Sequence, residues 1–231
     1  MNNIGIILQA RMSSKRLPGK ILKEIAGKPM LEHIFYRISF LKHKVEAVLA
    51  TSSSPEDDIV EAFCKHRNIH YFRGSNENVL ERFYLCSKEY GFLHIVRLTG
   101  DNPFVDIEEL DNLIDLHLRT RSDFTNSFQS LPVGVGAEIF TFAALEKSYR
   151  EAKLPHHIEH VDEYLLENPV LFKTSILSVS PDKNRPDIRL TVDTLEDFQL
   201  ACYVVKKSLG EFIMTQKAIE LSESFKKEAV L

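Results

Sequence analysis

The stretch IGIIL at positions 4–8 decides the fold, and the polar loop QARMSSKRLPGK follows it at positions 9–20. An unbroken apolar run is expected of a strand that is buried on both faces of a sheet. Further strand-like runs, separated by apolar residues at helical spacing, lie at 45–50, 69–72 and 94–98. This alternation predicts an α/β fold with a mostly parallel sheet and helices on both faces.

The second half of the chain is less regular than the first. Extended segments are expected at 123–126, 137–142, 171–179 and 189–192, and helices at 143–151, at 159–167 and from Thr194 onward. Neither an internal repeat nor a low-complexity linker divides the chain. Residues 1–231 are therefore expected to form a single domain.

Charge and cysteine content limit the class of protein. The formal net charge is only −4, so no global basic field would attract a nucleic acid. The three cysteines are dispersed without metal-binding spacing, which favours free thiols in a reducing compartment. The sequence has neither eighteen consecutive apolar residues nor a leader-like start, so we expect a cytoplasmic protein without a membrane span.

The loop at 9–20 carries four cations, among them Arg11 and Lys20. A nucleoside triphosphate brings about four negative charges, which such a loop matches with cations and exposed amides. The Pro18–Gly19 pair predicts a turn that directs Lys20 back toward the strand end. The loop has neither Walker A nor GxGxxG spacing, and on charge alone a solvated basic surface loop is equally open.

Two aspartates follow predicted strands. Asp101 lies in TGDNP at 99–103, and Asp193 lies just before a predicted helix start. Ligands of parallel sheets bind at the carboxyl ends of the strands, and Mg²⁺ commonly takes one or two carboxylates there. Turn formation by Asp101, and capping of the following helix by Asp193 or Thr194 with help from Asp197, are the alternatives.

Four blocks carry a resemblance to a known family: AR…SKRLPGK at 10–20, FRGS…VLER at 72–82, RLTGD at 97–101 and RLTVDT at 189–194. In this order they resemble the cytidylyltransferases that activate 3-deoxy-manno-octulosonate and acylneuraminates, most closely the spore coat polysaccharide biosynthesis protein F branch. The resemblance implies the nucleotide-diphospho-sugar transferase fold, which is Rossmann-like with three layers. It also implies Mg²⁺ and a homodimer, with a dimerisation or acceptor excursion around residues 128–180.

The resemblance further implies the roles of individual residues. Arg11 and Lys20 would hold the triphosphate, and Ala10 would line the base pocket. Asp101 and Asp193 would bind the metal and complete the catalytic group.

The loops after the second and third strands should border the same cleft. They make Thr51, Ser52 and Arg73 candidates for nucleotide binding. Asn78 and Arg82 join them because they share a helix face at i, i+4 spacing. A surface ion pair for Arg73 and an exposed helix position for Arg82 are the alternatives.

On the acceptor side, PVGVGAE at 132–138 resembles the family segment that lines the acceptor pocket, and EHV at 159–161 resembles a motif of the spore coat branch, although Asp162–Glu163 replaces the Thr-Pro that usually follows it. Glu138, Glu159 and His160 are therefore candidate substrate-binding residues. Glu138 alone could equally end a strand.

The sequence HHIEH at 156–160 contains HxxEH, the zinc motif of inverzincin peptidases. His156 and His160 would share a helix face, but a catalytic zinc needs a third protein ligand. No clear downstream glutamate on a second helix is apparent, and the α/β pattern favours nucleotide chemistry.

The predicted activity is the Mg²⁺-dependent transfer of CMP from CTP to a small acidic sugar-type acceptor, with release of pyrophosphate, for surface polysaccharide or glycan biosynthesis. One alternative is a related nucleotidyltransferase that uses another nucleotide, or a phosphonate or sugar-phosphate acceptor. The other is a non-catalytic nucleotide-binding partner.

Overall fold

In the computed structural model, residues 3–208 and 212–228 are described, so the ends of the predicted single domain and positions 209–211 lie outside the described residues. Within these ranges seven strands form one sheet in the order β5-β4-β1-β6-β8-β7-β9. Their bounds are β1 Ile4–Gln9, β4 Glu46–Ser52, β5 His70–Gly74, β6 His94–Thr99, β7 Phe124–Asn126, β8 Glu138–Thr141 and β9 Thr174–Ile176. Only β8 runs against its neighbours β6 and β7, so the predicted mostly parallel sheet is confirmed.

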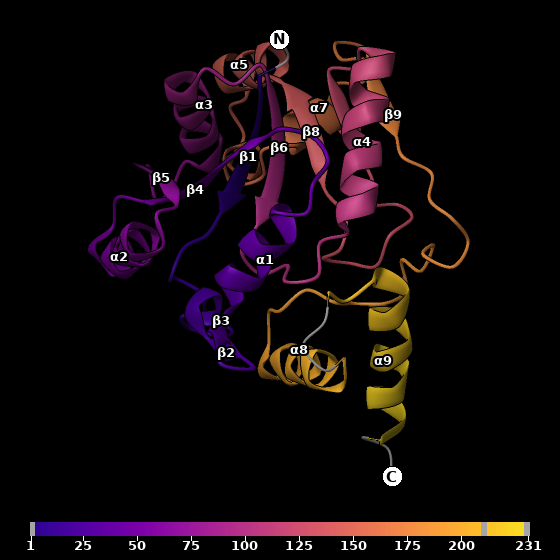
Figure 1. Ribbon diagram of the computed structural model, residues 1–231. Helices are drawn as coiled ribbons and strands as arrows, with labels where there is room; N and C mark the ends of the chain where they lie inside the picture. The colour runs from indigo at the N-terminus through magenta and orange to yellow at the C-terminus, as the bar shows by residue number, and fades with distance from the viewer. Residues whose placement is uncertain (1–2, 209–211, 229–231) are drawn as a thin grey trace.

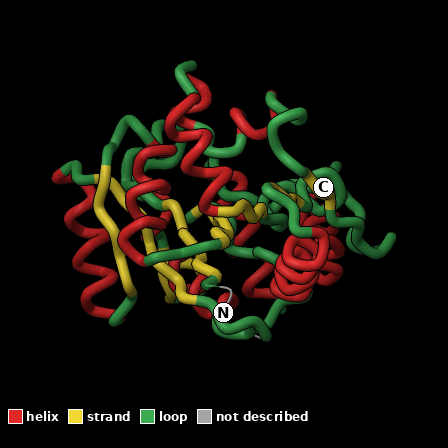
Figure 2. The backbone as a smooth tube through the Cα atoms, turned by 90° about the horizontal axis from the view of Figure 1, so that it is seen from above, coloured by secondary structure: helices red, strands yellow, loops and turns green. Residues whose placement is uncertain are grey.

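Helices cover both faces of this sheet, because alternate residues of each strand point to opposite sides. In β1, Ile6 and Leu8 belong to one buried apolar cluster and Ile7 belongs to the other. The first cluster includes residues of α1 (Met30–Ile38), α2 (Asp58–Arg67) and α4 (Ile107–Thr120), and the second includes residues of α3 (Val79–Tyr90) and α5 (Phe142–Glu151). Seen from above, the strands run between helices (Figure 2).

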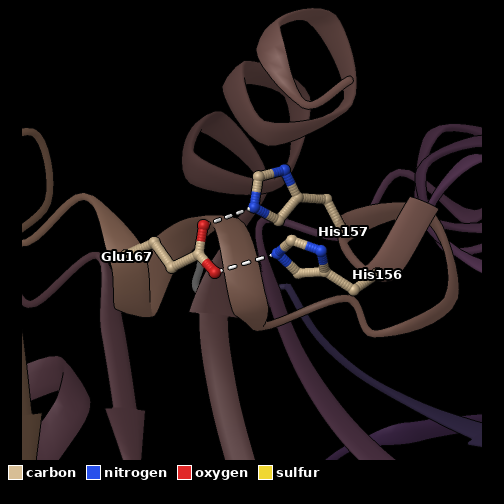
Figure 3. A group of neighbouring side chains, drawn as sticks. All are labelled: His156, His157 and Glu167. Atoms are coloured by element: carbon tan, nitrogen blue, oxygen red, sulfur yellow. Dashed lines mark hydrogen bonds and ion pairs between the residues drawn. The ribbon is translucent and has the colours of Figure 1, made fainter. Parts of the chain in front are cut away.

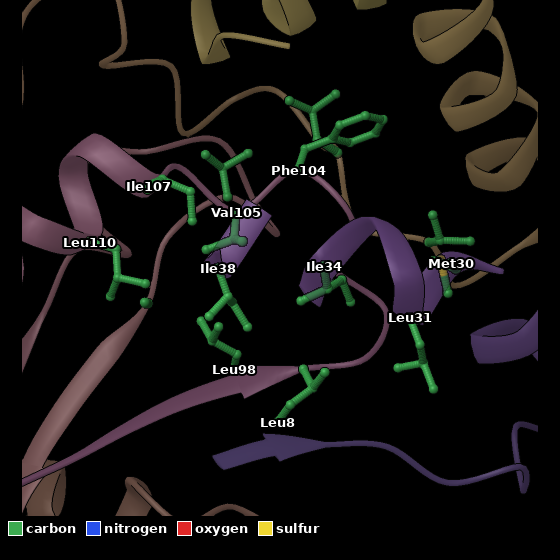
Figure 4. Packing of buried hydrophobic residues seen from close by; sticks show 14 of the residues in the cluster. Leu8, Met30, Leu31, Ile34, Ile38, Leu98, Phe104, Val105, Ile107 and Leu110 are labelled. Carbon is green, nitrogen blue, oxygen red and sulfur yellow. The ribbon is translucent and has the colours of Figure 1, made fainter. Parts of the chain in front are cut away.

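Packing of α1 on the sheet shows how the first layer is fixed. Leu31, Ile34 and Ile38 recur at helical spacing and are almost fully buried against Leu8 and Leu98 (Figure 4). Burying each such side chain stabilises the fold by about 1.5–3 kcal/mol relative to leaving it exposed. The layer therefore holds the loop between β1 and α1 against the sheet.

Two helices near the C-terminus, α8 (Leu195–Lys207) and α9 (Thr215–Glu228), lie below the sheet in Figure 1, on the side to which β1 points. They pack on each other, and α8 also contacts the small hairpin of β2 (Glu24–Ile25) and β3 (Lys28–Pro29). Two short 3₁₀ helices, η1 (Lys20–Leu22) and η2 (Pro55–Asp57), complete the loops at this end. No helix within the described ranges is long and apolar enough to cross a bilayer.

Two expected elements are wrong in detail. The helix expected at 159–167 is two short helices, α6 (Pro155–Glu159) and α7 (Glu163–Glu167), because His160 is extended and ends the first. The strand expected at 189–192 is an extended segment outside the sheet. Its amides bond to loop carbonyls instead, Leu190 to Val133 at 2.8 Å and Val192 to Asp101 at 2.8 Å.

Candidate active site

A cavity of about 350 Å³ opens where β1 and β6 end. Its walls come from the loop after β1, from the turn after β6 and from the end of α6. Six of the residues predicted from the sequence line it: Ala10, Arg11, Lys20, Asp101, Glu159 and His160. The structure therefore brings together residues that lie up to 150 positions apart, counting from Ala10 to His160 (160 − 10).

The loop after β1 folds back on itself as the Pro18–Gly19 pair predicts. Gly19 adopts the left-handed backbone conformation at φ 67°, which glycine tolerates best, and its N–H donates to Met12 O at 3.2 Å. The amide of Met12 in turn donates to Asp57 Oδ1 at 2.7 Å. This turn places Lys20 at the start of η1 with its side chain directed into the cavity.

Lys20 joins the two predicted metal-binding aspartates. Its Nζ lies 2.8 Å from Asp101 Oδ2 and 2.8 Å from Asp193 Oδ1. Asp101 and Asp193 therefore meet at one point, although they leave separate segments of the chain. Gly100 lets the turn that carries Asp101 pack closely on the loop after β1, since a Cβ at that position would lie 2.8 Å from the Cβ of Ala10.

Other cations complete the charge pattern around Asp193. Arg16 lies 3.0 Å from Asp193 Oδ1, and Arg189 forms a short ion pair with the other carboxylate oxygen. Burial alone would raise the pKa of Asp193, but hydrogen bonds from Lys20 and Arg189 hold it below its ordinary value. The carboxylate is thus ionised at neutral pH.

The donor set fits the magnesium ion that the resemblance implies. Two carboxylates already face one cationic atom, and they offer the hard oxygen ligands that Mg²⁺ prefers. Thr99 Oγ1 donates to the second oxygen of Asp101 at 2.6 Å and so fixes the orientation of that carboxylate. Asp101 and Asp193 are the residues that would hold the ion.

Arg11 also lies in the cavity and is held by neighbouring acceptors. Its Nη1 donates to Asn76 O at 3.1 Å and its Nη2 to Glu159 Oε1 at 2.5 Å.

Arg82 is not the exposed helix residue of the alternative interpretation, because it is fully buried near Arg11. Burial first, and the charge of Arg11 second, lower the pKa of Arg82 to about 10. Its Nε and Nη2 have no partner among the described protein atoms.

Five predicted nucleotide-binding residues do not line the cavity, and they are Arg82, described above, and Thr51, Ser52, Arg73 and Asn78. Thr51 and Ser52 are fully buried, and the Ser52 hydroxyl donates to Asp57. Arg73 pairs with Asp58 at 2.7 Å and with Glu61 at 2.6 Å, as in the ion-pair alternative. Asn78 is the N-cap of α3, where its side chain accepts from the amide of Glu81 at 2.8 Å.

Glu138 lies behind the cavity and not in its wall. It is fully buried, and Arg97 Nη1 donates to its Oε1 at 2.6 Å and to Asp162 Oδ1 at 3.3 Å. Burial and the nearby charge of Asp162 raise the pKa of Glu138 to about 8, against the opposing effect of Arg97. One arginine thus faces two carboxylates, and the more deeply buried one, Glu138, pairs with it at the shorter distance.

Arg97 is the site residue that the sequence reasoning missed. It lines the cavity beside Gln9 and Thr99, whereas its alternating position in β6 suggested only a strand residue. The signal available was an arginine in the middle of an apolar strand, which requires a buried acidic partner.

Sheet order, strand-end cavity and paired aspartates define the class of protein. The fold is that of the nucleotide-diphospho-sugar transferases, as predicted. It superimposes with a TM-score of 0.66 on CMP:2-keto-3-deoxy-manno-octonic acid synthetase complexed with CTP, at 16% identity over 89% of this chain and 99% of that one.

The family follows from sequence. A family model described as Cytidylyltransferase matches residues 5–229, and the chain belongs to this family. The spore coat polysaccharide biosynthesis protein SpsF of Bacillus subtilis is 38% identical over 204 residues, 86% of this chain and 85% of that protein. A cytidylyltransferase structure from Leptospira borgpetersenii matches with a TM-score of 0.87 and 33% identity, over 100% of this chain and 96% of that one. The predicted family and its spore coat branch are thus confirmed, and the protein is a nucleotidyltransferase.

Proposed function

We propose that the protein transfers CMP from CTP to a small acidic sugar-type acceptor and releases pyrophosphate, in the synthesis of a surface polysaccharide or glycan. The observation that carries the proposal is the meeting of Asp101 and Asp193 at Lys20, which lines the strand-end cavity. The printed names of the relatives, a polysaccharide biosynthesis protein and a CTP-bound sugar-acid synthetase, support the same chemistry.

In the proposed reaction an acceptor oxygen attacks the α-phosphorus of CTP. The new bond joins this oxygen to phosphorus, and the bond to the bridging oxygen breaks, so that its electron pair leaves with pyrophosphate. Arg11 and Lys20 would neutralise the triphosphate and stabilise charge that develops on the leaving group. Magnesium held by Asp101 and Asp193 would supply further positive charge at the phosphoryl oxygens.

The cations of the site are paired with carboxylates in the absence of a nucleotide, so their positive charges do not repel one another unopposed. Lys20 is paired with two aspartates and Arg11 with Glu159, so both cations already have anionic partners. A triphosphate would replace these carboxylates as the partner of each cation. Arg82 adds a buried positive charge next to Arg11, which favours an anion at this position.

We assign three of the polar residues in the cavity wall, Arg97, Glu159 and His160, to the acceptor. Arg97 is suited to the acid group of the acceptor because a guanidinium pairs bidentately with a carboxylate. Arg97 donates to Glu138 and Asp162 on the side away from the cavity. Glu138 would therefore act as a positioning residue and not as a direct ligand of acceptor hydroxyls.

We also propose a cytoplasmic homodimer. Exposed apolar side chains gather along the predicted excursion at 128–180, and they are Phe128, Val133, Leu154, Leu166, Val170, Leu171 and Ile176. Cys64, Cys86 and Cys202 are free thiols, as expected in a reducing compartment.

The test measures pyrophosphate release with a panel of nucleotides and with 2-keto sugar acids, sugar phosphates and phosphonates as acceptors. We expect release with CTP and an acidic sugar, and a loss of at least about 10²-fold in Asp101→Asn without loss of the fold. Release with a different nucleotide would favour the related nucleotidyltransferase. Binding of CTP without release for any acceptor would favour the non-catalytic partner.

A further inference from the structure

Two histidines and a glutamate meet outside the candidate active site. His156 and His157 lie on α6, and Glu167 ends α7. His156 Nε2 lies 2.9 Å from Glu167 Oε1, and His157 Nε2 lies 2.6 Å from Glu167 Oε2. In Figure 3 both imidazole rings direct a nitrogen toward the same carboxylate.

The arrangement has the composition and spacing of a metal site. One ligand atom from each of the three residues lies within 4.8 Å of the other two. Imidazole nitrogen and carboxylate oxygen are ligands of zinc, and three protein ligands leave one tetrahedral position for water. The side chains of His156 and Glu167 are 44% and 45% exposed, so an ion can reach them from solvent.

The cluster differs from the zinc motif in the sequence. HxxEH would pair His156 with His160, but α6 ends at Glu159 and His160 is an exposed cap residue. His157 takes its place, and its ring is fixed by packing at 5.4 Å from Tyr164. Glu167 is the glutamate on a second helix that was not apparent in the sequence.

We propose that His156, His157 and Glu167 bind a divalent transition metal ion, zinc above all, which would fasten α6 to α7. The site is separate from the nucleotide cavity and does not depend on the proposed reaction. Glu159 and His160 lie two and three positions after His157 and line that cavity, so a bound ion would also fix the segment that carries them.

The surroundings of His157 limit the expected affinity. When Nε2 binds a metal, Nδ1 must carry the ring proton, and this atom is buried without a partner in the described part of the chain. Loss of such a supporting hydrogen bond typically weakens metal binding by about 10–100-fold. We therefore expect a micromolar dissociation constant and not a nanomolar one.

The test is a calorimetric titration of the metal-stripped full chain with zinc chloride, in a large excess of magnesium chloride. An excess of magnesium competes with zinc for carboxylate oxygens such as those of the aspartate pair, but it competes poorly for imidazole. We expect one zinc ion per chain, and at least tenfold weaker binding in His156→Ala and in Glu167→Gln. Zinc at 100 times its dissociation constant should raise the Tm of the wild type by about 5–10 °C, and that of Glu167→Gln by much less.

His160→Ala is the matched control, because it removes a neighbouring histidine that belongs to the sequence motif but not to the cluster. It should keep the wild-type zinc affinity. The proposal is overturned if the wild type binds no zinc, if His156→Ala and Glu167→Gln bind it unchanged, or if His160→Ala loses as much affinity as His156→Ala. Circular dichroism of each of the three variants checks that the fold is kept.

Discussion

At the scale of single residues, Lys20 contacts both aspartates that are proposed to hold the metal ion, Asp101 and Asp193. One lysine charge faces two carboxylates, each of which would be costly to leave unpaired where it is partly buried. The same side chain is the one proposed to hold the triphosphate. Lys20 therefore competes with a metal ion for Asp101 and Asp193 until a nucleotide gives it another partner.

Lys20→Met tests this competition. We expect kcat/KM for CTP to fall by about 10²–10³-fold, because an electrostatic contact with the reacting phosphates is lost. Without nucleotide, the same variant should bind Mg²⁺ more tightly than the wild type, since no lysine occupies the aspartates. Steady-state pyrophosphate release and a magnesium titration measure the two effects.

Lys15→Met provides the control for that experiment. Lys15 is an exposed cation of the same loop that does not line the cavity, so neither quantity should change beyond a small effect of net charge. Weaker magnesium binding in Lys20→Met than in the wild type would contradict the competition.

At the scale of elements, the start of α3 decides between two roles for Asn78. Its side chain accepts from the amide of Glu81 at 2.8 Å, which satisfies one of the amides that lack a helical partner. We expect Asn78→Ala to lower the free energy of unfolding by about 0.5–2 kcal/mol, and to leave KM for CTP unchanged. Urea denaturation and steady-state kinetics give the two numbers.

Asn78→Asp keeps a capping oxygen and should restore most of the stability. A rise in KM for CTP in Asn78→Ala, with stability unchanged, would instead support the nucleotide-binding role that the i, i+4 spacing suggested.

Elements that depend on local signals could be predicted from the sequence, and those that depend on distant partners could not. Apolar runs in the sequence correctly predicted β1, β4, β5 and β6. The helix predicted to begin at Thr194 is also confirmed, because Thr194 caps α8 in a capping box with Asp197. The segment at 189–192 alternates like a strand, but no neighbouring strand accepts it, and it bonds to Val133 and Asp101 instead.

The same distinction applies to the candidate site. Arg11, Lys20, Asp101 and Asp193 could be predicted because each lies in a sequence block of the family or directly after a strand. Arg97 was missed although it opens the block at 97–101, because it lies within a strand and its place in the cavity depends on the buried carboxylates of Glu138 and Asp162, which arrive from other segments. Arg73 lies elsewhere because Asp58 and Glu61 on α2 hold it.

At the scale of the whole molecule, the excursion at 128–180 combines three features. It supplies Glu159 and His160 to the cavity, it contains the His156–His157–Glu167 cluster, and it carries the exposed apolar side chains of the proposed dimer contact. A second copy that packs on Leu154 or Leu166 would contact the ends of the two helices that surround the cluster. Dimerisation would then restrict the same segment that a metal ion would fix.

Val170→Asp tests the proposed dimer at its most exposed apolar position, where the side chain is 95% accessible. A carboxylate buried in a contact between two copies would lack a partner, so we expect the variant to be a monomer while the wild type is a dimer. Analytical ultracentrifugation at several concentrations measures the mass of each. Ile59→Asp is the control, since Ile59 is 53% exposed on α2, near the opposite edge of the sheet (Figure 1), and should leave the dimer intact. A wild type that sediments as a monomer at every concentration, or a Val170→Asp variant that remains a dimer, would show that Val170 lies outside any such contact.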